Sequence, residues 1–591
     1  MSEYRAPLED MRFVLRELVG LERVASLPGY EEADPDVVDA ILDEAARFAG
    51  EVLSPLNRVG DLHGAQLRPG EVTTAPGFRE AYRSFVEAGW NGLAAPQEFG
   101  GQGLPRLLAA AVGEMWKGAN HAFSLCPMLT QGAIEALLLA GTEAQRALYL
   151  PRLVAGEWTG TMNLTEPAAG SDLAAIRTRA EPVGDGSYRV FGQKIFITYG
   201  EHDLAENIIH LVLARIAGAP EGVKGISLFL VPKFLPGPDG APGARNDVRC
   251  LSLEHKLGIH GSPTAVLAFG EAGGALGTLV GEANRGLEMM FIMMNAARFN
   301  VGLEGLGDAE RAYQRAAAYA RERVQGFEAG QRQGGRVPIL RHPDVRRLLM
   351  AMRSRIEAMR ALAYGVAAAL DEADRHPDGA IRAEARAFAE LLVPVVKGWC
   401  TENAVDIASQ GIQVHGGAGY IEETGAAQHL RDARITAIYE GTTAIQANDL
   451  VGRKLLRDGG AALAALVAIM RRDAHAAGAD PVGQRLLDAI DALERAGAWL
   501  VAEGNRNVVA ALAGSVPFLL LLGSTAGGWQ MARAAAIATE RQAAGDTAPF
   551  WSAKLATARF YADHFLTQAP GMAASICEGA AATLAMPDQC F

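Results

Sequence analysis

The stretch SYRVFGQKIFITYGEHDLAENIIHLVLARI, residues 187–216, decides the fold that this sequence predicts. It contains two apolar runs, 187–198 and 207–216, which are rich in β-branched and aromatic residues and are separated by a segment with glycine and aspartate. Runs of this composition and length are typical of β-strands, and the polar segment is typical of a connection between them. The sequence therefore predicts strands in the middle of the chain.

Two further apolar runs, 225–233 and 262–270, extend this region. The Pro/Gly-rich segment 235–248 between them predicts a loop. Several short strands separated by turn signals favour a small barrel or sandwich. We therefore expect an all-β domain over residues 161–275.

Residues on both sides of the β region predict helices. The segment AILDEAARFAGEVL, 40–53, repeats apolar residues at helical spacing, and the helical period returns after Gly286. The expected fold class is mainly α with an inserted β-barrel domain. The expected segments are a helical domain over 1–160, the β-domain over 161–275, a second helical domain over 276–451 and a C-terminal helical extension over 452–591.

This order of elements argues against nucleotide-binding folds that alternate strands with helices. No GxGxxG motif follows a predicted strand, and no GxxxxGK[ST] motif is present. A nicotinamide-dependent Rossmann enzyme and a P-loop ATPase are both disfavoured.

The composition and net charge of the chain limit the kinds of molecule that it is expected to bind. The chain has 591 residues, of which 49% are hydrophobic and 21% are charged, so it is long enough for several domains and too apolar to be disordered. Its net charge of −13 disfavours nucleic acid as a partner, because an acidic surface repels phosphate groups. The five cysteines form no CxxC pair, which gives no support for a metal site and suits a reducing compartment.

The N-terminal sequence and the apolar runs predict a cytoplasmic protein that does not bind membranes. The start, MSEYRAPLEDMRFVL, carries acidic residues early and does not resemble a signal peptide. The longest apolar run, 508–523, is interrupted by Ser515 and Pro517 and is short for a bilayer span. We expect it to form a buried pair of helices with a turn at 514–517.

A carboxylate stands at a position suited to acid–base chemistry in RDARITAIYEGTTAIQ, residues 431–446. The pair Thr443 and Gln446 has capping-box spacing, so a helix is expected to begin at Thr443, shortly after Glu440. Apolar neighbours would desolvate Glu440 and raise its pKa, as a general base requires. The alternative is a structural glutamate that complements the helix dipole.

Three other segments are suited to binding a cofactor, and each has a structural alternative. The glycines of QVHGGAGY, 413–420, would let backbone amides approach a phosphate, or would simply end a helix. The segment MNLTEPAAGSD, 162–172, predicts a loop with hydroxyl and amide donors. In FGQKIFIT, 191–198, Phe196 and Thr198 share one strand face, which would contact a flat heterocycle or lie half-buried in an ordinary strand.

Two arginines and one histidine complete the candidates. Arg298 and Arg323, in the helical region after Gly286, would bind a phosphate or a neighbouring carboxylate. His415 is expected to pack or to form hydrogen bonds, because no second metal ligand stands at helical spacing from it.

Taken together and in this order, these segments resemble the acyl-CoA dehydrogenase family. The matching motifs are TEPAAGSD, GQKIFIT, ARERVQG, QVHGGAGY and RDARITAIYEGTTAIQ, and the resemblance covers residues 36–450. Members of that family hold FAD at the junction of an α-domain, a β-domain and a second α-domain. The resemblance implies an enzyme that converts an acyl-CoA thioester to a trans-2-enoyl-CoA.

The resemblance also implies roles for individual residues. Glu440 would be the catalytic base that takes the α-proton, while the β-hydrogen leaves as hydride to N5 of FAD, and the Glu440 amide would help to polarise the thioester carbonyl. Tyr439 and Gly441 would flank the acyl chain. Ser171 and Arg298 would hold the CoA moiety. The residues implied in FAD binding are Met162, Leu164, Thr165, Phe196, Thr198, Arg323, Gln413, Gly417 and Thr442.

The chain departs from the family pattern at some of these positions. Phe196 stands where many members have tryptophan, and Met162 stands where some have tyrosine. Some branches carry the base on the helix around Arg298, but residues 295–297 of this chain include no carboxylate. Glu440 is therefore the one well-placed candidate for the base.

The residues beyond 450 resemble the longer bacterial subfamily of 3-methylmercaptopropionyl-CoA dehydrogenases, which acts on methylthio and short- to medium-chain acyl-CoAs. In the family, Gln413 and Gly417 reach the FAD of the neighbouring subunit, so the resemblance implies an obligate oligomer. Because the extension is expected to cover the surface on which subunits of the usual tetramer pair, we expect a homodimer. The family's usual electron acceptor is an electron-transferring flavoprotein.

Three related functions remain open on the sequence alone. An acyl-CoA oxidase would use the same base and flavin but would pass electrons to oxygen. A DNA-associated flavoprotein of the same fold would need a basic extension, whereas residues 452–591 hold 12 basic and 12 acidic residues. A very-long-chain enzyme that docks on membranes would need a basic amphipathic helix, for which the apolar run at 518–522 is the candidate.

Overall fold

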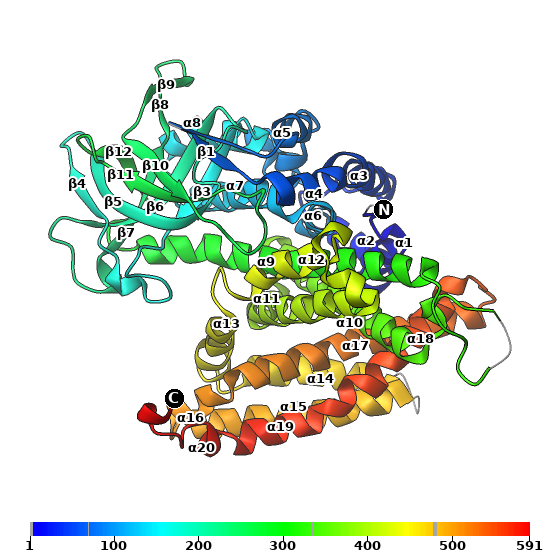
Figure 1. The fold of residues 1–591 in the computed structure, drawn as a ribbon. Coiled ribbons are helices and arrows are strands. Elements are labelled where there is room, and N and C mark those ends of the chain that lie inside the picture. The colour runs from blue at the N-terminus through cyan, green and yellow to red at the C-terminus, as the bar shows by residue number, and fades with distance from the viewer. Residues whose placement is uncertain (1–3, 69, 332–334, 477–480) are drawn as a thin grey trace. The chain divides into compact units, whose positions relative to one another are not determined.

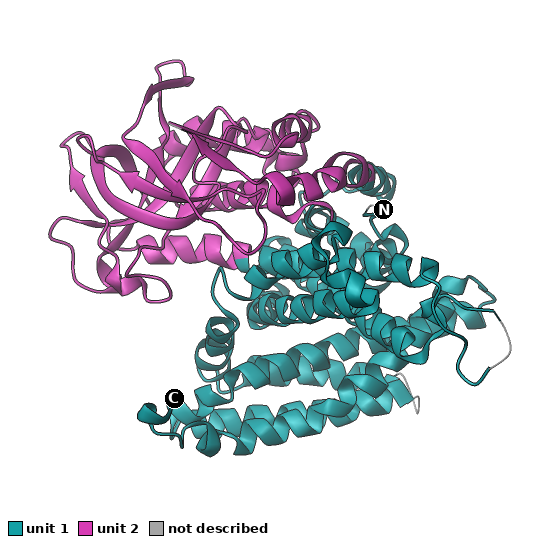
Figure 2. Cartoon of the chain, in the orientation of Figure 1, with its two compact units in different colours: residues 1–46, 105–118, 298–591 teal, residues 47–104, 119–297 magenta. Residues whose placement is uncertain are grey.

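The chain folds into two compact units, each built from segments that are distant in sequence (Figure 2). Unit 1 is formed by residues 1–46, 105–118 and 298–591, and unit 2 by residues 47–104 and 119–297. The computed structural model describes residues 4–68, 70–331, 335–476 and 481–591. The units do not follow the four sequence segments expected above, because the chain crosses between them at 46/47, 104/105, 118/119 and 297/298. The first and last of these crossings lie inside helices α3 (Pro35–Phe48) and α9 (Gly286–Glu322). The boundaries of those four segments stay a prediction.

Unit 2 contains a closed β-barrel (Figure 1). Five strands pair in a ring in which the last returns to the first: β5 (Ser187–Thr198), β12 (Ala275–Val280), β7 (Ile226–Pro232), β6 (Asn207–Ile216) and β4 (Arg179–Pro182). Three more strands extend the sheet: β3 (Trp158–Asn163), β10 (Val248–Leu253) and β11 (Thr264–Phe269). The predicted inserted barrel is confirmed, and the strands predicted at 187–198 and 207–216 coincide with β5 and β6.

The barrel is filled by side chains from alternate positions of its strands. Residues two apart in a strand point to the same face, so buried pairs at this spacing mark the inward face. Such pairs are Val212 and Ala214, Phe229 and Val231, and Leu267 and Phe269. A fully buried Val, Leu or Phe side chain contributes about 1.5–3 kcal/mol. β-Branched and aromatic residues dominate these runs because they fit the pleated surface of a strand.

The Pro/Gly-rich segment 235–248 does not form a strandless loop, so that expectation is wrong. It contributes to a small antiparallel ribbon of β8 (Phe234–Pro236) and β9 (Pro242–Arg245). Both strands of a two-stranded ribbon are edge strands. Proline is tolerated in an edge strand because its missing N–H can face away from the partner strand. Gly240, at φ +74°, supplies the left-handed residue that the turn between the strands requires.

Four α-helices lie wholly within unit 2, which also holds the first part of α9: α4 (Ser54–His63), α5 (Phe78–Glu87), α7 (His121–Ala140) and α8 (Glu143–Ala155). Within the described ranges, α7 is the one helix long and apolar enough to cross a bilayer, and 78% of its most apolar window is buried inside the protein. It packs on β3 at Gly160, where an added Cβ would lie 2.4 Å from the Cβ of Ala133. Such burial is typical of a core helix.

The regular secondary structure of unit 1 is helical within the described residues, apart from one isolated β-bridge between Val324 and Pro338. Figure 1 shows α10 and α11 side by side, with α17 packed against both. Its principal helices, besides the parts of α3 and α9 that belong to it, are α1 (Leu8–Phe13), α2 (Leu21–Ala25), α6 (Arg106–Ala119), α10 (Pro343–Arg375), α11 (Gly379–His415), α12 (Ala426–Ala433) and α13 (Thr443–Asp449). The extension supplies α14 (Ala461–Ala476), α15 (Pro481–Gly504), α16 (Val508–Ala513), α17 (Ser515–Ala543), α18 (Pro549–His564), α19 (Ala569–Glu578) and α20 (Ala580–Thr583).

The extension packs on helices of its own subunit through small residues of α17. An added Cβ at Gly523 would lie 2.3 Å from the Trp399 ring of α11, so only glycine permits this approach. At the start of α17, Ser515 Oγ donates to Asn448 Oδ1 of α13 at 2.9 Å. The expected break between two helices occurs at Gly514, which ends α16. The leucines and Phe518 within 518–522 are largely buried, so this run does not form a membrane-docking surface.

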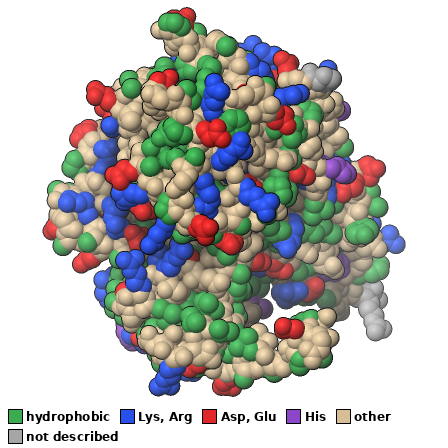
Figure 3. Space-filling model, turned by 90° about the vertical axis from the view of Figure 1, so that its left-hand side faces the viewer, with side chains coloured by type: hydrophobic (Ala, Val, Ile, Leu, Met, Phe, Trp, Pro, Cys, Tyr) green, Lys and Arg blue, Asp and Glu red, His purple; other side chains and the backbone are tan. Residues whose placement is uncertain are grey.

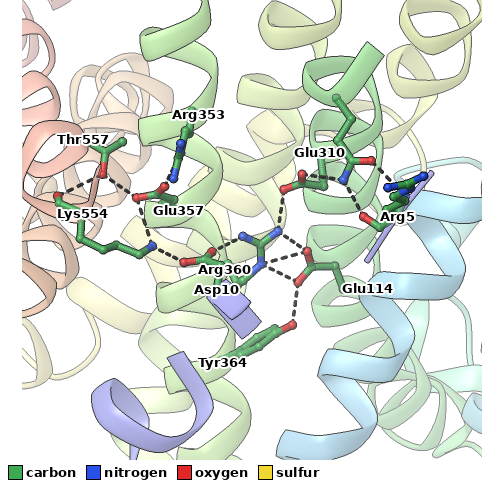
Figure 4. Close-up of polar contacts among 11 residues, drawn as sticks. Arg5, Asp10, Glu114, Glu310, Arg353, Glu357, Arg360, Tyr364, Lys554 and Thr557 are labelled. Atoms are coloured by element: carbon green, nitrogen blue, oxygen red, sulfur yellow. Dashed lines mark hydrogen bonds and ion pairs between the residues drawn. The ribbon is translucent and has the colours of Figure 1, made fainter. Parts of the chain in front are cut away.

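A cluster of buried charged side chains joins α1, α6, α9, α10 and α18 in unit 1 (Figure 4). Arg360 donates to both carboxylate oxygens of Glu114 at 2.6–3.2 Å and to Glu310 at 2.7 Å. It also pairs with Asp10, which in turn pairs with Lys554 of the extension. Against the effect of burial, Lys554 and Arg360 lower the pKa of Asp10 to about 2. One carboxylate thus ties the N-terminal helix to both the core and the extension.

Charged side chains of both signs are interspersed over the face drawn in Figure 3. In the extension, basic residues have acidic neighbours, as in the pairs Arg471–Asp491 at 2.9 Å and Arg559–Asp563 at 2.6 Å. These acidic neighbours offset the basic charge of the described part of the extension, whereas a DNA-binding surface requires a broad basic field.

Candidate active site

Glu440 lies in a sharp turn between a 3₁₀ turn (Arg434–Ala437) and α13. Its φ is +53° and that of Gly441 is +89°, so two successive residues are left-handed. This conformation costs a non-glycine residue about 1–2 kcal/mol, and such strain gathers at functional sites. Gln446 holds the turn, because its Nε2 donates to the carbonyl oxygens of Glu440 and Gly441 at 3.2 and 3.1 Å.

Helix α13 begins at Thr443 as expected, but its cap differs from the predicted one. The hydroxyl of Thr442 accepts the N–H of Ile445 at 3.3 Å, because Thr442 has the extended ψ of 162° that an N-cap needs. The hydroxyl of Thr443 instead donates to Glu402 Oε1 of α11 at 2.5 Å. The predicted capping box between Thr443 and Gln446 is therefore wrong, and the amide of Gln446 is used by the turn.

The surroundings of Glu440 favour its neutral form. Burial raises the pKa of Glu440 to about 7, the carboxylate of Glu304 adds to the rise, and the cationic side chains of Lys397 and Arg298 oppose it. Glu304 is fully buried on α9 and accepts a hydrogen bond from the hydroxyl of Tyr439. A glutamate that only complements a helix dipole would have a lowered pKa, so the raised pKa favours the role of a general base.

Arg298 is buried and forms an ion pair with a carboxylate. Only 4% of it is exposed, and its Nη1 donates to Asp449 Oδ2 at 3.1 Å. Asp449 is the last residue of α13, so the ion pair braces the helix that begins beside Glu440. This placement does not support the expected contact of Arg298 with CoA.

In unit 2, the candidate flavin residues gather at the end of β5. Phe196 is 58% exposed and left-handed, with φ +60°, which is an unfavourable state for a large aromatic residue. The loop after β3 is tied to this strand, since Ile195 N–H donates to the carbonyl of Thr165 at 2.9 Å. Leu164 and Thr165 are thereby brought beside the strand that carries Phe196 and Thr198.

A buried lysine holds that loop in place. Lys194 is fully buried, and its Nζ donates to the carbonyl of Leu164 at 2.9 Å and to Glu166 Oε1 at 2.8 Å. Met162 is 7% exposed near the end of β3, so its side chain belongs to the packed interior. Ser171 lies exposed in the loop that follows.

The remaining cofactor candidates lie on unit 1. Gln413 and Gly417 are exposed at the C-terminal end of α11 and just beyond it, and no atom lies within 4 Å of a Cβ added at Gly417. Arg323 is exposed just beyond α9. His415 stacks on Tyr319 with ring centroids 4.4 Å apart and hydrogen-bonds to the carbonyl of Gly411 at 2.7 Å, which confirms its packing role.

Two charged residues that act on Glu440, Glu304 and Lys397, were not predicted. Nor were Lys117, which interacts with Glu304, and Asp449, which pairs with Arg298. Sequence did contain a signal for two of them. Lys397 interrupts the apolar run LLVPVV of α11, and Glu304 stands among small and apolar residues in VGLEGLG of α9. A charge within an otherwise buried helical face is unusual unless it is paired or functional.

Comparison with known proteins decides the family. Acyl-CoA dehydrogenase models match the chain in four parts: the N-terminal domain over residues 36–157, the middle domain over 161–272, the C-terminal domain over 284–455, and an acetyl-CoA dehydrogenase C-terminal-like domain over 461–587. The 3-methylmercaptopropionyl-CoA dehydrogenase of Ruegeria pomeroyi is 50% identical over 570 residues, which are 96% of each chain. The chain belongs to the acyl-CoA dehydrogenase family.

Other acyl-CoA dehydrogenases share its length or its fold. The broad-specificity linear acyl-CoA dehydrogenase FadE5 of Mycobacterium tuberculosis is 36% identical over 590 residues, 96% of each chain. A solved acyl-CoA dehydrogenase complexed with FAD from Bacillus anthracis is 21% identical, with a TM-score of 0.75 over 98% of this chain and 92% of that chain. The similarity in fold therefore extends over the helical extension.

The enzyme is an FAD-dependent oxidoreductase that acts on an acyl-CoA thioester. Its residues fit that cofactor. The exposed, left-handed Phe196 of unit 2 offers a flat apolar surface, and Thr198 lies two residues along the same strand. In unit 1, the space around Gly417 leaves backbone amides accessible to a phosphate.

Replacing Gly441 by alanine should impair catalysis more than folding. An added Cβ would lie 2.7 Å from Gln446 Nε2, and φ of +89° is unfavourable for alanine. The turn that aims Glu440 must therefore shift. We expect flavin reduction to slow by at least about 10-fold, since displacing a catalytic group by about 1 Å can cost up to 10²-fold. Stopped-flow reduction by acyl-CoA measures the rate. Gly417→Ala, with open space around it, should fold equally well. An unchanged reduction rate in Gly441→Ala would contradict this account of the turn.

Proposed function

We propose that Glu440 is the base in the α,β-dehydrogenation of an acyl-CoA. The proposal rests on one observation: Glu440 is held in a strained left-handed turn and has a pKa raised to about 7. A base with a pKa near the working pH is about half ionised and still strong enough to accept a proton from carbon. Glu304, Lys397 and Arg298 are the charged groups that act on it.

In the proposed reaction, the α-carbon loses its proton to the Glu440 carboxylate and the β-carbon loses a hydride, so that a trans double bond forms between them. FAD, when bound, supplies the acceptor for that hydride and its two electrons. The Glu440 backbone N–H has no hydrogen-bond partner among the residues described, and it is therefore available to polarise the thioester carbonyl as negative charge develops. Gly441, with no side chain, leaves room for the acyl chain beside the base.

The other residues divide between cofactor and substrate. In this proposal Leu164, Thr165, Phe196 and Thr198 contact the flavin, with Met162 contributing mainly its backbone. Arg323 and Thr442 bind the remainder of FAD, and Ser171 contacts CoA. For Arg298, its ion pair with Asp449 supports a role in bracing α13 rather than in binding CoA.

The pH dependence of kcat/KM should report the base. Glu440 is protonated and inactive below its pKa, and it becomes competent as pH rises through about 7. We therefore expect kcat/KM to increase tenfold per pH unit on the acid side and to level off above about pH 8. Measuring kcat/KM from pH 5.5 to pH 9 with a dye acceptor tests this. A flat profile across pH 6–8 would contradict a base with this pKa.

We infer that the substrate is 3-methylmercaptopropionyl-CoA or another short- to medium-chain acyl-CoA. The support is 50% identity over 96% of both chains to a 3-methylmercaptopropionyl-CoA dehydrogenase. A panel of methylthiopropionyl-CoA and straight-chain acyl-CoAs from C4 to C16, together with aryl acyl-CoAs, should give its highest kcat/KM for the methylthio compound or for C4–C8. A maximum at C14–C16 or with an aryl group would overturn this assignment.

We also propose that electrons leave through an electron-transferring flavoprotein. One similar solved chain, 28% identical with a TM-score of 0.57 over 71% of this chain and 98% of that chain, comes from a study of the electron-transferring flavoprotein of Acidaminococcus fermentans. The competing function is an oxidase. Flavin bleached anaerobically by substrate should stay reduced for minutes after air is admitted. Rapid reoxidation with stoichiometric peroxide would favour the oxidase.

The proposed assembly is a homodimer in the cytoplasm. Gln413 and Gly417 are exposed, and so are Tyr420 (85%) and Ile421 (51%), an arrangement that suits a surface covered by a second subunit. The five cysteines form no disulfide, which suits a reducing compartment. Light scattering should give twice the chain mass, and a tetramer would contradict the dimer.

A further inference from the structure

Lys397 is a buried lysine whose charge is not used by the fold. It lies on α11 and is fully buried, and its Nζ has no hydrogen-bond partner among the described residues. Burying an ammonium group without a hydrogen bond is costly, and structural lysines normally reach a carbonyl or a carboxylate. Lys194 of unit 2 does so, with two acceptors within 2.9 Å. The position of Lys397 therefore requires another explanation.

Close helix packing prevents Lys397 from reaching solvent. An added Cβ at Gly302 of α9 would lie 2.5 Å from Val396 Cγ1, and one at Gly398 would lie 2.9 Å from Leu519 of α17. The residues on either side of Lys397 are thus pressed against two different helices. Its side chain is enclosed within unit 1.

The charges around Lys397 include the proposed base. Glu440, Glu304 and Glu402 favour its cationic form, and Arg298 opposes it. Two of these carboxylates are tied to the turn that carries the base: Glu304 accepts from the Tyr439 hydroxyl, and Glu402 accepts from Thr443 at 2.5 Å. Four other charged groups face this set. Lys117 acts on Glu304 and donates to Asn300 at 3.2 Å, and Asp308 acts on Tyr439. Asp449 pairs with Arg298 and lies beside Arg453.

We propose that Lys397 and Glu304 are a pair of positioning residues of opposite charge that set the proton affinity of Glu440. Lys397 stabilises the carboxylate that must be present before substrate binds. Glu304, linked to the turn through Tyr439, disfavours that carboxylate and so strengthens it as a base. The proposal rests on the proposed role of Glu440 and adds to it the two groups that adjust its strength in opposite directions.

The direction of each titration supports this arrangement. Burial lowers the pKa of Lys397 to about 8, and the carboxylates of Glu440, Glu304 and Glu402 keep it from falling further. Lys397 is therefore still mostly cationic at pH 7. The pKa of Glu440 is raised by burial and by Glu304 and lowered by Lys397. Lys397 and Glu304 therefore act on the proton affinity of Glu440 in opposite directions.

The test is the midpoint of the pH profile of flavin reduction, measured by anaerobic stopped flow with acyl-CoA on the FAD-loaded enzyme. Lys397→Met should move the midpoint upward by about one unit, and Glu304→Gln should move it downward by a similar amount. Lys397→Arg, which keeps the charge, should stay near the wild-type midpoint. Opposite shifts from two buried substitutions are not expected from loss of packing.

Lys554→Met is the matched control, because Lys554 is also a buried lysine but belongs to the separate cluster of Figure 4. It should leave the midpoint unchanged.

If Lys397→Met fails to fold, Lys397→Gln and Glu304→Gln still test the proposal. Unchanged midpoints, or shifts in the same direction, would overturn the proposal. If Glu440→Gln reduces its flavin normally, the proposed function fails as well. If Glu440→Gln is inactive but the midpoints do not move, only the pairing of Lys397 with Glu304 fails.

Discussion

Replacing Glu440 by glutamine should leave FAD bound and slow flavin reduction by acyl-CoA by roughly 10³–10⁴-fold, at the upper end of what a positioned base contributes. Glutamine has the size of glutamate and keeps the backbone turn, but it cannot accept the α-proton. The measurement is the single-turnover rate of flavin bleaching at pH 8. Bound FAD is quantified by its absorbance after denaturation.

Glu440→Gln should lose flavin reduction because it lacks the base, and not because it is less stable. Because the folded-state pKa of Glu440 is about 7 and its ordinary value is 4.5, its proton stabilises the fold below pH 4.5, and that stabilisation is lost as pH rises through 7. Glutamine resembles the protonated form, so Glu440→Gln should be at least as stable as the wild type at pH 8. Glu390→Gln, an exposed glutamate on α11 that pairs with Lys454, should change the rate less than about threefold. A wild-type rate in Glu440→Gln would sink the assignment.

Replacing Arg360 by methionine should destabilise unit 1 by about 3–5 kcal/mol, the cost of removing one partner from a buried ionic cluster. Arg360 is 1% exposed, and its loss leaves the carboxylates of Glu114 and Glu310 buried without their cation. Burial already raises the pKa of Glu114 against the effect of Arg360. Without Arg360, Asp10 loses one of the two cations that hold it between the N-terminal helix and the extension.

Urea unfolding followed by circular dichroism measures this effect. Arg360→Lys should lie between the wild type and Arg360→Met, because an ammonium group cannot form the paired contacts of a guanidinium. Arg559→Met is the control: its ion pair with Asp563 is exposed, and its removal should cost less than about 0.5 kcal/mol. Equal effects of Arg360→Met and Arg559→Met would show that the buried cluster does not stabilise unit 1.

The architecture was largely predictable, because the signals for it are local. The strands β5 and β6 have the predicted bounds, since each is an apolar run between polar turns. The helix pair at Gly514 follows from a glycine next to a proline-containing apolar run. The β8–β9 ribbon was missed because its prolines disfavour a strand in general and are tolerated only where no partner needs their N–H.

The active site was predictable only in part. Glu440 and Phe196 stand in segments whose residue types suit their proposed chemistry, but the left-handed backbone of both is imposed by tertiary structure. Arg298 pairs with Asp449, which is 151 residues away in the chain, and no local sequence pattern connects the two. Glu304 and Lys397 come near Glu440 only because glycines let α9 and α11 approach closely, and this too is invisible to sequence periodicity.

The most direct test of the central claim isolates proton removal from hydride transfer. An acyl-CoA with no β-hydrogen, 3,3-dimethylbutyryl-CoA, cannot be dehydrogenated, so any chemistry at its α-carbon reports the base alone. Incubated with the FAD-loaded enzyme in D₂O, it should gain deuterium at the α-carbon by mass spectrometry with the wild type and none above background with Glu440→Gln. Equal deuterium uptake with both proteins would contradict Glu440 as the base.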